Sequence, residues 1–347
     1  MLRAPRVAAV AVMAAVGLSS GAFAQNLVFS LFERYLESLR IQAGIPGLSA
    51  AVVQNGTIVW ERGFGQADVE NSLPARPDTP YHLADLTQLL TTQLLAQCAE
   101  RGRVRAEDSI RQWVPLADPP ATVGQLLSHS SGAPPAFKYE PARFALLTVP
   151  VEQCDSKPFR KVMADQIIGR LGMTDAAPGR DFATLLVDDA PIFEPQAIQR
   201  YNAVLQRMAV PYKVDRRGRP TRGDLPPPML NAATGLVASV RDLAKFDKDL
   251  AGLRDDTLEQ IWNNQRIGDT LIPMGLGWFV QIYQNERLVW HFGVTPDGYS
   301  SLLLKAPSRQ LTLILLANSD GLSVPFPLQD GDVTSSLFAL TFLRLFL

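Results

Sequence analysis

The sequence predicts a mixed α/β (α+β) protein with one antiparallel sheet built from both ends of the chain and a helical region between them. Strand-like segments of alternating or β-branched residues occur within about 25–80 and again within 272–347. Residues from about 85 to 265 instead show the three- and four-residue spacing of apolar side chains that is typical of helices. Since the two β-rich parts flank the helical one, we expect a single sheet with a helical subdomain beside it.

The first 24 residues have the features of a secretory signal peptide. Arg3 and Arg6 supply positive charge, residues 7–17 are apolar, and Ala22-Phe23-Ala24 fits a cleavage site. The apolar run is too short to cross a bilayer, and no later segment approaches that length. We therefore expect a mature chain that begins at Gln25, has no transmembrane segment and is exported to the periplasm or medium. An uncleaved N-terminal anchor is the alternative.

Composition argues against nucleic acid and anionic membranes as partners. Hydrophobic residues make up 47% of the chain, as in globular proteins, and the net charge is −1. Loss of Arg3 and Arg6 with the signal peptide makes it −1 − 2 = −3. No strong positive field remains to attract polyanions.

The two cysteines, Cys98 and Cys154, leave two possibilities open. In an oxidising compartment they could form one disulfide, whereas Cys98 lies in an apolar helical stretch and could also be a buried free thiol. Neither cysteine belongs to a cluster with metal-ligand spacing, so no metal and no cofactor is expected.

Each end of the chain contributes strands and one helix. A helix is expected over Leu27–Ala43, followed by strands at Leu48–Val53 and Thr57–Trp60 around an Asn55-Gly56 turn, whose residues tolerate positive φ. Near the other end the sequence predicts a terminal helix over Leu337–Leu347. The strands expected before that helix are Gly275–Tyr283, Arg287–His291, Tyr299–Leu304 and Gln310–Ala317.

In the middle region an apolar helix is expected to start at Asp85 and to end at Arg101-Gly102. Further helices are expected at Thr122–Ser128, Pro158–Leu171 and Val240–Leu253. The basic stretch Lys213–Arg222 is expected to be a solvated loop, with an acidic-ligand patch as the alternative.

Several motifs, in this order along the chain, resemble those of the serine β-lactamase and penicillin-binding-protein superfamily, in its class C-like branch of DD-peptidases and esterases. They are Gly47-Leu-Ser-Ala-Ala-Val-Val, Ala84-x-x-Thr87, Thr122-Val-x-x-Leu-Leu-x-His129-x-Ser-Gly, Leu171-Gly-Met-x-Asp175, Ala233-x-Gly-Leu-x-x-Ser-x-x-Asp-Leu-Ala-Lys-Phe246 and His291-x-Gly-x-Thr-Pro-x-Gly-Tyr-Ser-Ser301. The resemblance implies a five-stranded antiparallel sheet, an all-helical subdomain and a site at their junction.

The resemblance also implies that the catalytic groups of the family are replaced. Where the family has S-x-x-K, with serine as nucleophile and lysine as base, this chain has Asp85 and Gln88. Its Y-x-N reads Tyr139-Glu140-Pro141, and its K-T-G or H-T-G reads His291-Phe292-Gly293, followed by Val294. Only six residues separate Gly132 from Tyr139, where the family has a longer segment that walls the cleft.

Each site position also has a structural interpretation. Asp85 with Gln88 three residues on fits a helix-capping box, whereas a nucleophilic Asp85 would suit glycosyl or phosphoryl transfer and lacks a placed second carboxylate. Tyr139 fits a core phenol, His129 a structural hydrogen-bonding residue and Glu140 a surface charge. His291 is the best remaining titratable group, although a histidine at a strand end is often only packed.

No other serine fits the role of nucleophile. Ser128, Ser130 and Ser131 flank His129 without an elbow motif or a lysine one helical turn on. Ser300 and Ser301 lie on a predicted strand.

The sequence thus predicts a catalytically inactive homologue with a binding or regulatory role in the cell envelope. Its ligand would be a cell-wall peptide or a small amide or amine, because the charge of Asp85 repels carboxylates, and Pro141, Phe292, Gly293 and Val294 would line the site. One alternative is a hydrolase with altered chemistry that uses Asp85, Tyr139 and His291. Another is a scaffold whose surface binds a protein partner.

Overall fold

The protein is described by a computed structural model that covers residues 27–182, 186–187 and 190–347. The predicted signal peptide therefore lies outside the described residues. Within the described part of the chain, no helix is both long and apolar enough to cross a membrane.

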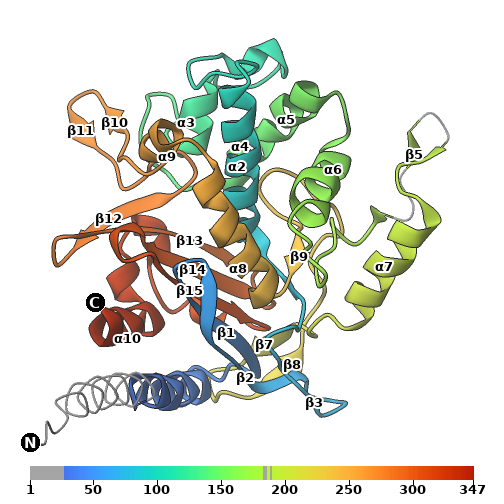
Figure 1. Ribbon diagram of the computed structural model, residues 1–347, viewed down its shortest axis with the longest axis vertical. Helices are drawn as coiled ribbons and strands as arrows, with labels where there is room; N and C mark the ends of the chain where they lie inside the picture. The colour runs from blue at the N-terminus through green and yellow to red at the C-terminus, as the bar shows by residue number, and fades with distance from the viewer. Residues whose placement is uncertain (1–26, 183–185, 188–189) are drawn as a thin grey trace, which may run out of the picture.

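One antiparallel sheet of seven strands forms the centre of the fold, in the order β12-β13-β14-β15-β1-β2-β3 (Figure 1). The strands are β1 (Gly47–Gln54), β2 (Thr57–Asp68), β3 (Leu73–Pro74), β12 (Phe279–Tyr283), β13 (Glu286–Val294), β14 (Ser300–Ala306) and β15 (Leu311–Ala317). The pairing of β1 with β15, with Leu48 opposite Ala317, joins the two ends of the chain as predicted. The count of five strands that the resemblance implies is too low, since the sheet contains all six strands predicted from the sequence pattern and the two-residue β3 at one edge.

The turn between β1 and β2 follows directly from its sequence. Asn55 and Gly56 have φ values of 52° and 69°, the left-handed conformation that a two-residue hairpin turn of this type requires. Gln54 pairs with Thr57 across the turn, so the predicted hairpin is confirmed.

Both faces of the sheet are buried, because successive residues of the central strands alternate between two cores. On β1, Ala50 and Val52 pack into one core and Ala51 and Val53 into the other. The first core is covered by the helix over residues 27–42 and by α10 (Leu337–Phe346) (Figure 1). The two helices contact each other, since the ring of Phe32 on the first lies 5.3 Å from the ring of Phe346 on α10. The second core faces the helical part of the chain.

The helices of the middle region surround α2, a buried helix that starts one short turn after the predicted position. Its 3₁₀ turn η1 covers Ala84–Leu86 and α2 itself covers Thr87–Glu100. The other helices are α3 (Val123–Leu127), α4 (Pro141–Phe144), α5 (Thr148–Asp155), α6 (Phe159–Val162) with the π-helical η4 (Met163–Gly169), α7 (Pro195–Gln206), α8 (Val240–Asp249) and α9 (Asp255–Ile261). The sequence had indicated α3, α6 with η4, and α8, but not α5, α7 or α9.

The middle region is not purely helical, contrary to the expectation from the family resemblance. Short antiparallel pairs also occur there and at its ends, namely β4 (Tyr81–His82) with β9 (Val237–Ala238), β5 (Leu186–Val187) with β6 (Ala190–Pro191), β7 (Tyr212–Val214) with β8 (Pro220–Arg222), and β10 (Arg266–Ile267) with β11 (Thr270–Leu271). The predicted basic loop is thus the β7–β8 hairpin.

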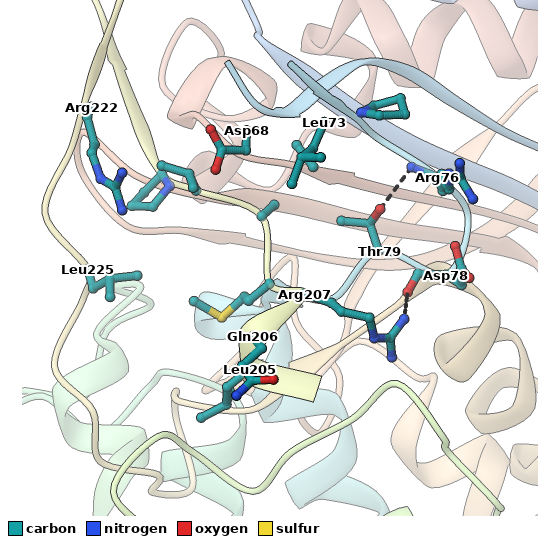
Figure 2. Close-up of a pocket in the computed structure, with 16 residues that line it drawn as sticks. Asp68, Leu73, Arg76, Asp78, Thr79, Leu205, Gln206, Arg207, Arg222 and Leu225 are labelled. Carbon is teal, nitrogen blue, oxygen red and sulfur yellow. Dashed lines mark hydrogen bonds between the residues drawn. The ribbon is translucent and has the colours of Figure 1, made fainter. Parts of the chain in front are cut away.

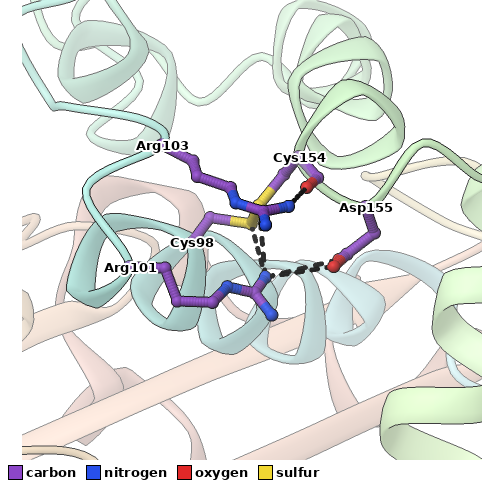
Figure 3. The surroundings of a disulfide bond; sticks show 5 residues. All are labelled: Cys98, Arg101, Arg103, Cys154 and Asp155. Atoms are coloured by element: carbon purple, nitrogen blue, oxygen red, sulfur yellow. Dashed lines mark hydrogen bonds and ion pairs between the residues drawn. A yellow bond between two sulfur atoms is a disulfide. The ribbon is translucent and has the colours of Figure 1, made fainter.

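Cys98 and Cys154 form a disulfide that ties α2 to α5 (Figure 3). Their Cα atoms lie 6.2 Å apart and both side chains are buried. Arg101 lies against the bond, with Nη2 3.3 Å from Sγ of Cys98 and 3.2 Å from Sγ of Cys154, and it also reaches Asp155 (Figure 3). The structure therefore decides between the two possibilities that the sequence left open.

Candidate functional site

Asp85 lies in a backbone turn that is fixed from two sides. Ala84, the residue before it, has a φ of 51°, which is uncommon for a residue with a Cβ. The N–H of Ala84 donates to Nδ1 of His82 over 3.1 Å, and the N–H of Leu83 donates to the carbonyl of Leu236 over 2.8 Å. These bonds set the position from which Asp85 enters η1.

Strand β13 packs directly on this turn because Gly293 has no side chain. A Cβ at Gly293 would lie 2.4 Å from the carbonyl oxygen of Leu83 and 2.8 Å from the nitrogen of Leu86. The hydroxyl of Ser301, on the neighbouring strand, donates to the same carbonyl of Leu83 over 2.8 Å. The sheet and the start of α2 therefore meet at Asp85, at the junction where the resemblance placed the site.

The prediction that Asp85 and Gln88 form a capping box is wrong. The residues at the N-caps of η1 and α2 are Leu83 and Leu86, and neither makes a side-chain cap. The 3₁₀ turn ahead of α2 places Asp85 inside the first turn rather than before it. Its carboxyl group is hydrogen-bonded to Tyr139 instead.

One backbone N–H and three side chains lead to Asp85 in a chain of hydrogen bonds with one direction. The N–H of Glu140 donates to Nδ1 of His129 over 3.0 Å, so the neutral imidazole carries its proton on Nε2. This Nε2 lies 3.0 Å from Oε1 of Gln88, and Nε2 of Gln88 lies 3.4 Å from the hydroxyl of Tyr139. The hydroxyl of Tyr139 in turn donates to Asp85. Every donor in this chain thus points toward Asp85.

The pKa values of these groups follow from burial. Burial raises the pKa of Asp85 to about 7, against the opposing hydrogen bond from Tyr139, and raises that of Tyr139 well above 10. Burial and the neighbouring His291 lower the pKa of His129 to about 3, against the opposing hydrogen bond with Glu140. His129 is therefore neutral at physiological pH, whereas Asp85 titrates near it.

The prediction that His291 lies at a strand end is wrong. The residue lies inside β13 and is fully buried. Its Nδ1 donates to the carbonyl of Phe292 over 2.7 Å, and in the described residues its Nε2 has no partner. Burial lowers the pKa of His291 to about 4. Its ring lies 5.9 Å from that of Tyr139, so it packs near Asp85 without bonding to it.

Aromatic side chains pack around the hydroxyl-bearing ring of Tyr139. The centroids of the Phe292 and Phe279 rings lie 5.1 Å and 5.7 Å from it, and the His129 ring lies 4.6 Å away. Five cavities in the described part of the chain are lined neither by Asp85 nor by any of these rings. Of the other residues predicted to line the site, Pro141 starts α4 and Val294 ends β13.

His129 is the structural hydrogen-bonding residue that the sequence indicates, whereas Phe279 has no role in the site predicted from the sequence. Both touch Tyr139, and nothing in the local sequence signals these contacts because they join separate elements. Among the described residues, Cys98, Cys154 and Asp155 form the group closest to metal-ligand geometry. The disulfide leaves that group no thiolate, so its residues do not fit a metal.

A sequence model of the β-lactamase family matches residues 31–333. The chain belongs to the β-lactamase family. Protein flp of Staphylococcus aureus (strain MW2) is 25% identical to it over 310 residues, and the match covers 81% of this chain and 61% of flp. The chain thus spans about three fifths of the length of this relative. The human mitochondrial serine beta-lactamase-like protein LACTB is 31% identical over 105 residues, 28% of this chain and 19% of LACTB.

Three solved structures share the fold of this chain. The octameric penicillin-binding protein homologue from Pyrococcus abyssi has a TM-score of 0.72 at 20% identity and covers 91% of this chain and 77% of its own. The D-amino acid amidase from Ochrobactrum anthropi has a TM-score of 0.69 at 20% identity, with coverage of 90% and 99%. The class C beta lactamase from Rhodobacter sphaeroides has a TM-score of 0.68 at 16% identity, with coverage of 90% and 99%. The predicted family and fold class are confirmed.

Proposed function

We propose that this chain is a non-hydrolytic member of the β-lactamase family that binds a ligand at Asp85 and serves a binding or regulatory role in the cell envelope. The family resemblance aligns Asp85 and Gln88 with the catalytic serine and lysine. An aspartate cannot form the alkoxide that attacks a carbonyl, and a glutamine cannot accept a proton.

The observation that carries this proposal is the directed chain of hydrogen bonds from Glu140 to Asp85. The Oε1 and Nε2 atoms of Gln88 are both engaged, and both ring nitrogens of His129 are engaged as well. A base must have a free lone pair directed at the nucleophile. Neither Gln88 nor His129 offers one, and His129 has a pKa of about 3.

The class of ligand follows from the groups that remain. A carboxylate accepts about four hydrogen bonds, and Tyr139 supplies Asp85 with one. Asp85 is half-buried, so its remaining acceptor capacity can meet a ligand. The best partner of the ionised Asp85 is therefore an amine or an amide N–H, as in a cell-wall peptide with a free amino group. Because the pKa of Asp85 is about 7, a bound ammonium group would favour the ionised form, which repels carboxylates. The envelope location rests on the predicted signal peptide.

One observation favours a second function, a hydrolase with altered chemistry. Asp85 has a pKa of about 7 and bonds to Tyr139. A carboxyl group that titrates near neutral pH is suited to general acid–base catalysis.

The two functions are separated by incubating the purified mature protein with a fluorescent penicillin and a chromogenic ester, read by intact mass and by turnover. We expect no adduct and no turnover from a protein whose folding is verified by its thermal transition. The Asp85→Asn variant and the control Glu140→Gln, which changes a carboxylate paired with Lys138, are measured alongside. A covalent adduct, or turnover lost only in Asp85→Asn, would establish the hydrolase instead.

The ligand class is tested by calorimetry with an alanyl dipeptide amide and its N-acetylated twin. We expect the peptide with the free amine to bind and its N-acetylated twin to bind at least tenfold more weakly. The Asp85→Asn variant should bind the two peptides with equal affinity. Equal affinities for the two peptides would show that Asp85 does not recognise an amine.

A further inference from the structure

A cavity of about 530 Å³ lies on another part of the molecule and shares no lining residue with the Asp85 site (Figure 2). Its walls come from the end of β2, from β3, from the segment 76–79, from the end of α7 with residues 207–211, and from Arg222 and Leu225. This volume is within the usual range for pockets that bind small molecules.

Of the three arginines that line this cavity, one is ion-paired and two are not, although Arg222 also attracts the carboxylate of Asp68. Arg207 is committed to Asp175, with Nη2 2.6 Å from Oδ1. The exposed Arg76 and Arg222 make no ion pair or side-chain hydrogen bond with the described residues. Figure 2 shows them on opposite sides of the cavity. Their planar N–H groups are suited to bidentate recognition of a carboxylate or phosphate.

The acidic residues of the cavity limit which anions fit. Asp68 already accepts from the backbone N–H and the side-chain Nδ2 of Asn71, at 2.9 Å and 2.7 Å, and Asp78 lies on the Arg76 side (Figure 2). Two carboxylates in the wall repel a doubly charged phosphate more strongly than a singly charged carboxylate.

The cavity also has an exposed apolar wall. Leu73 is 54% exposed and Leu225 is 49% exposed, and both line the cavity together with the partly buried Leu205 and Met208. Covering such side chains with an aliphatic group removes apolar surface from water, which stabilises a complex. An inorganic anion would leave these leucines exposed.

We propose that this cavity binds a small amphipathic monocarboxylate, with its carboxylate held by Arg76 or Arg222 and its aliphatic chain against Leu73 and Leu225. The proposal also separates Arg222 from the rest of the basic stretch Lys213–Arg222. Lys213 pairs with Asp297 and Arg219 with Asp215, whereas Arg222 alone of that stretch lines the cavity.

The test is calorimetric titration of the mature protein with octanoate, its neutral analogue octanamide, and inorganic phosphate. We expect saturable binding of octanoate only. Arg222→Gln and Arg76→Gln test the guanidinium groups, Leu225→Ser tests the apolar wall, and Arg216→Gln is the control, because Arg216 is exposed on the same hairpin and does not line the cavity.

We expect a tenfold or greater loss of octanoate affinity in at least one arginine variant, a smaller loss in Leu225→Ser, and no change in Arg216→Gln. The Asp85→Asn variant should bind octanoate as the wild type does, so this test is independent of the function proposed above. The proposal is overturned if octanoate does not saturate, if octanamide or phosphate binds equally well, or if both arginine variants keep full affinity.

Discussion

His129 Nε2 lies 3.0 Å from Oε1 of Gln88, and this contact orients the amide that meets Tyr139. Because Nδ1 of His129 accepts from the backbone of Glu140, its Nε2 must be the donor, and Oε1 of Gln88 must face it. A buried side chain on α2 is thereby held by a loop residue far along the chain. The bond thus links the start of the central helix to the segment that carries Tyr139.

Replacing Gln88 with leucine should destabilise the protein by about 1–3 kcal/mol, the usual cost of leaving a buried donor unsatisfied. The N–H of His129 would lose its acceptor while the shape of the side chain is kept. Urea unfolding of the variant measures the loss. The control Gln42→Leu removes an exposed hydrogen bond to Ser38 and should change stability little. Equal effects of the two changes would show that the hydrogen bond to His129 contributes nothing.

The carboxyl group of Asp85 should make stability fall as pH rises. Its folded pKa, about 7, lies above the ordinary value of 3.8, so the folded state holds the proton more tightly than the unfolded state does. The stability contributed by the protonated group is complete below about pH 4 and is lost as pH approaches 7. In Asp85→Asn this loss should be absent, so the variant gains stability relative to wild type across that range.

Chemical denaturation at several pH values between 4 and 8 checks this expectation. The control Asp224→Asn removes an exposed carboxylate, so the effect specific to Asp85 is the pH dependence that only Asp85→Asn removes. A difference between Asp85→Asn and wild type that is flat with pH would mean that Asp85 is ionised at low pH.

The disulfide between Cys98 and Cys154 should stabilise the fold by about 2–4 kcal/mol, because it closes a loop between residues 56 apart in the sequence. The double variant Cys98→Ala/Cys154→Ala should lose that amount in urea unfolding. A thiol reductant should lower the stability of the wild type toward that of the variant and leave the variant unchanged. A wild type that is insensitive to complete reduction would contradict the expectation.

Gly293→Ala should lower the free energy of unfolding by about 1–3 kcal/mol, the usual range for overpacking a filled site. The added methyl would collide with backbone atoms of Leu83 and Leu86, which cannot move away without shifting the turn that carries Asp85. Thermal unfolding measures the cost. The control Gly252→Ala places its methyl in open space and should be near neutral. Similar melting temperatures for the two variants would show that β13 does not need its close approach to η1.

Much of the fold could be predicted because its signals are local. The turn at Asn55-Gly56 and the strands on both sides of it follow from residues adjacent in the sequence, and Thr122 and Gln125 form a capping box from neighbouring positions. The helices that the sequence did not indicate, such as α5 and α9, are short, and most of their stability comes from packing rather than from propensity.

The candidate site could be located but not described from the sequence. The motifs indicated Asp85, Gln88, Tyr139 and His291, whereas the partner of Asp85 was wrongly predicted because local capping rules favoured its own backbone. The three-residue turn η1 changed that outcome by moving Asp85 past the cap position.

The sequence by itself determined six of the seven sheet strands and the central helix, since periodicity and turn chemistry depend on neighbouring residues. Its ordered motifs determined membership of the β-lactamase family. Only the tertiary structure decided that Asp85 bonds to Tyr139, that Cys98 pairs with Cys154, and that Arg76 and Arg222 face one cavity. Each of these relationships joins residues from separate elements. Their geometry is set by how the elements pack, which no local pattern encodes.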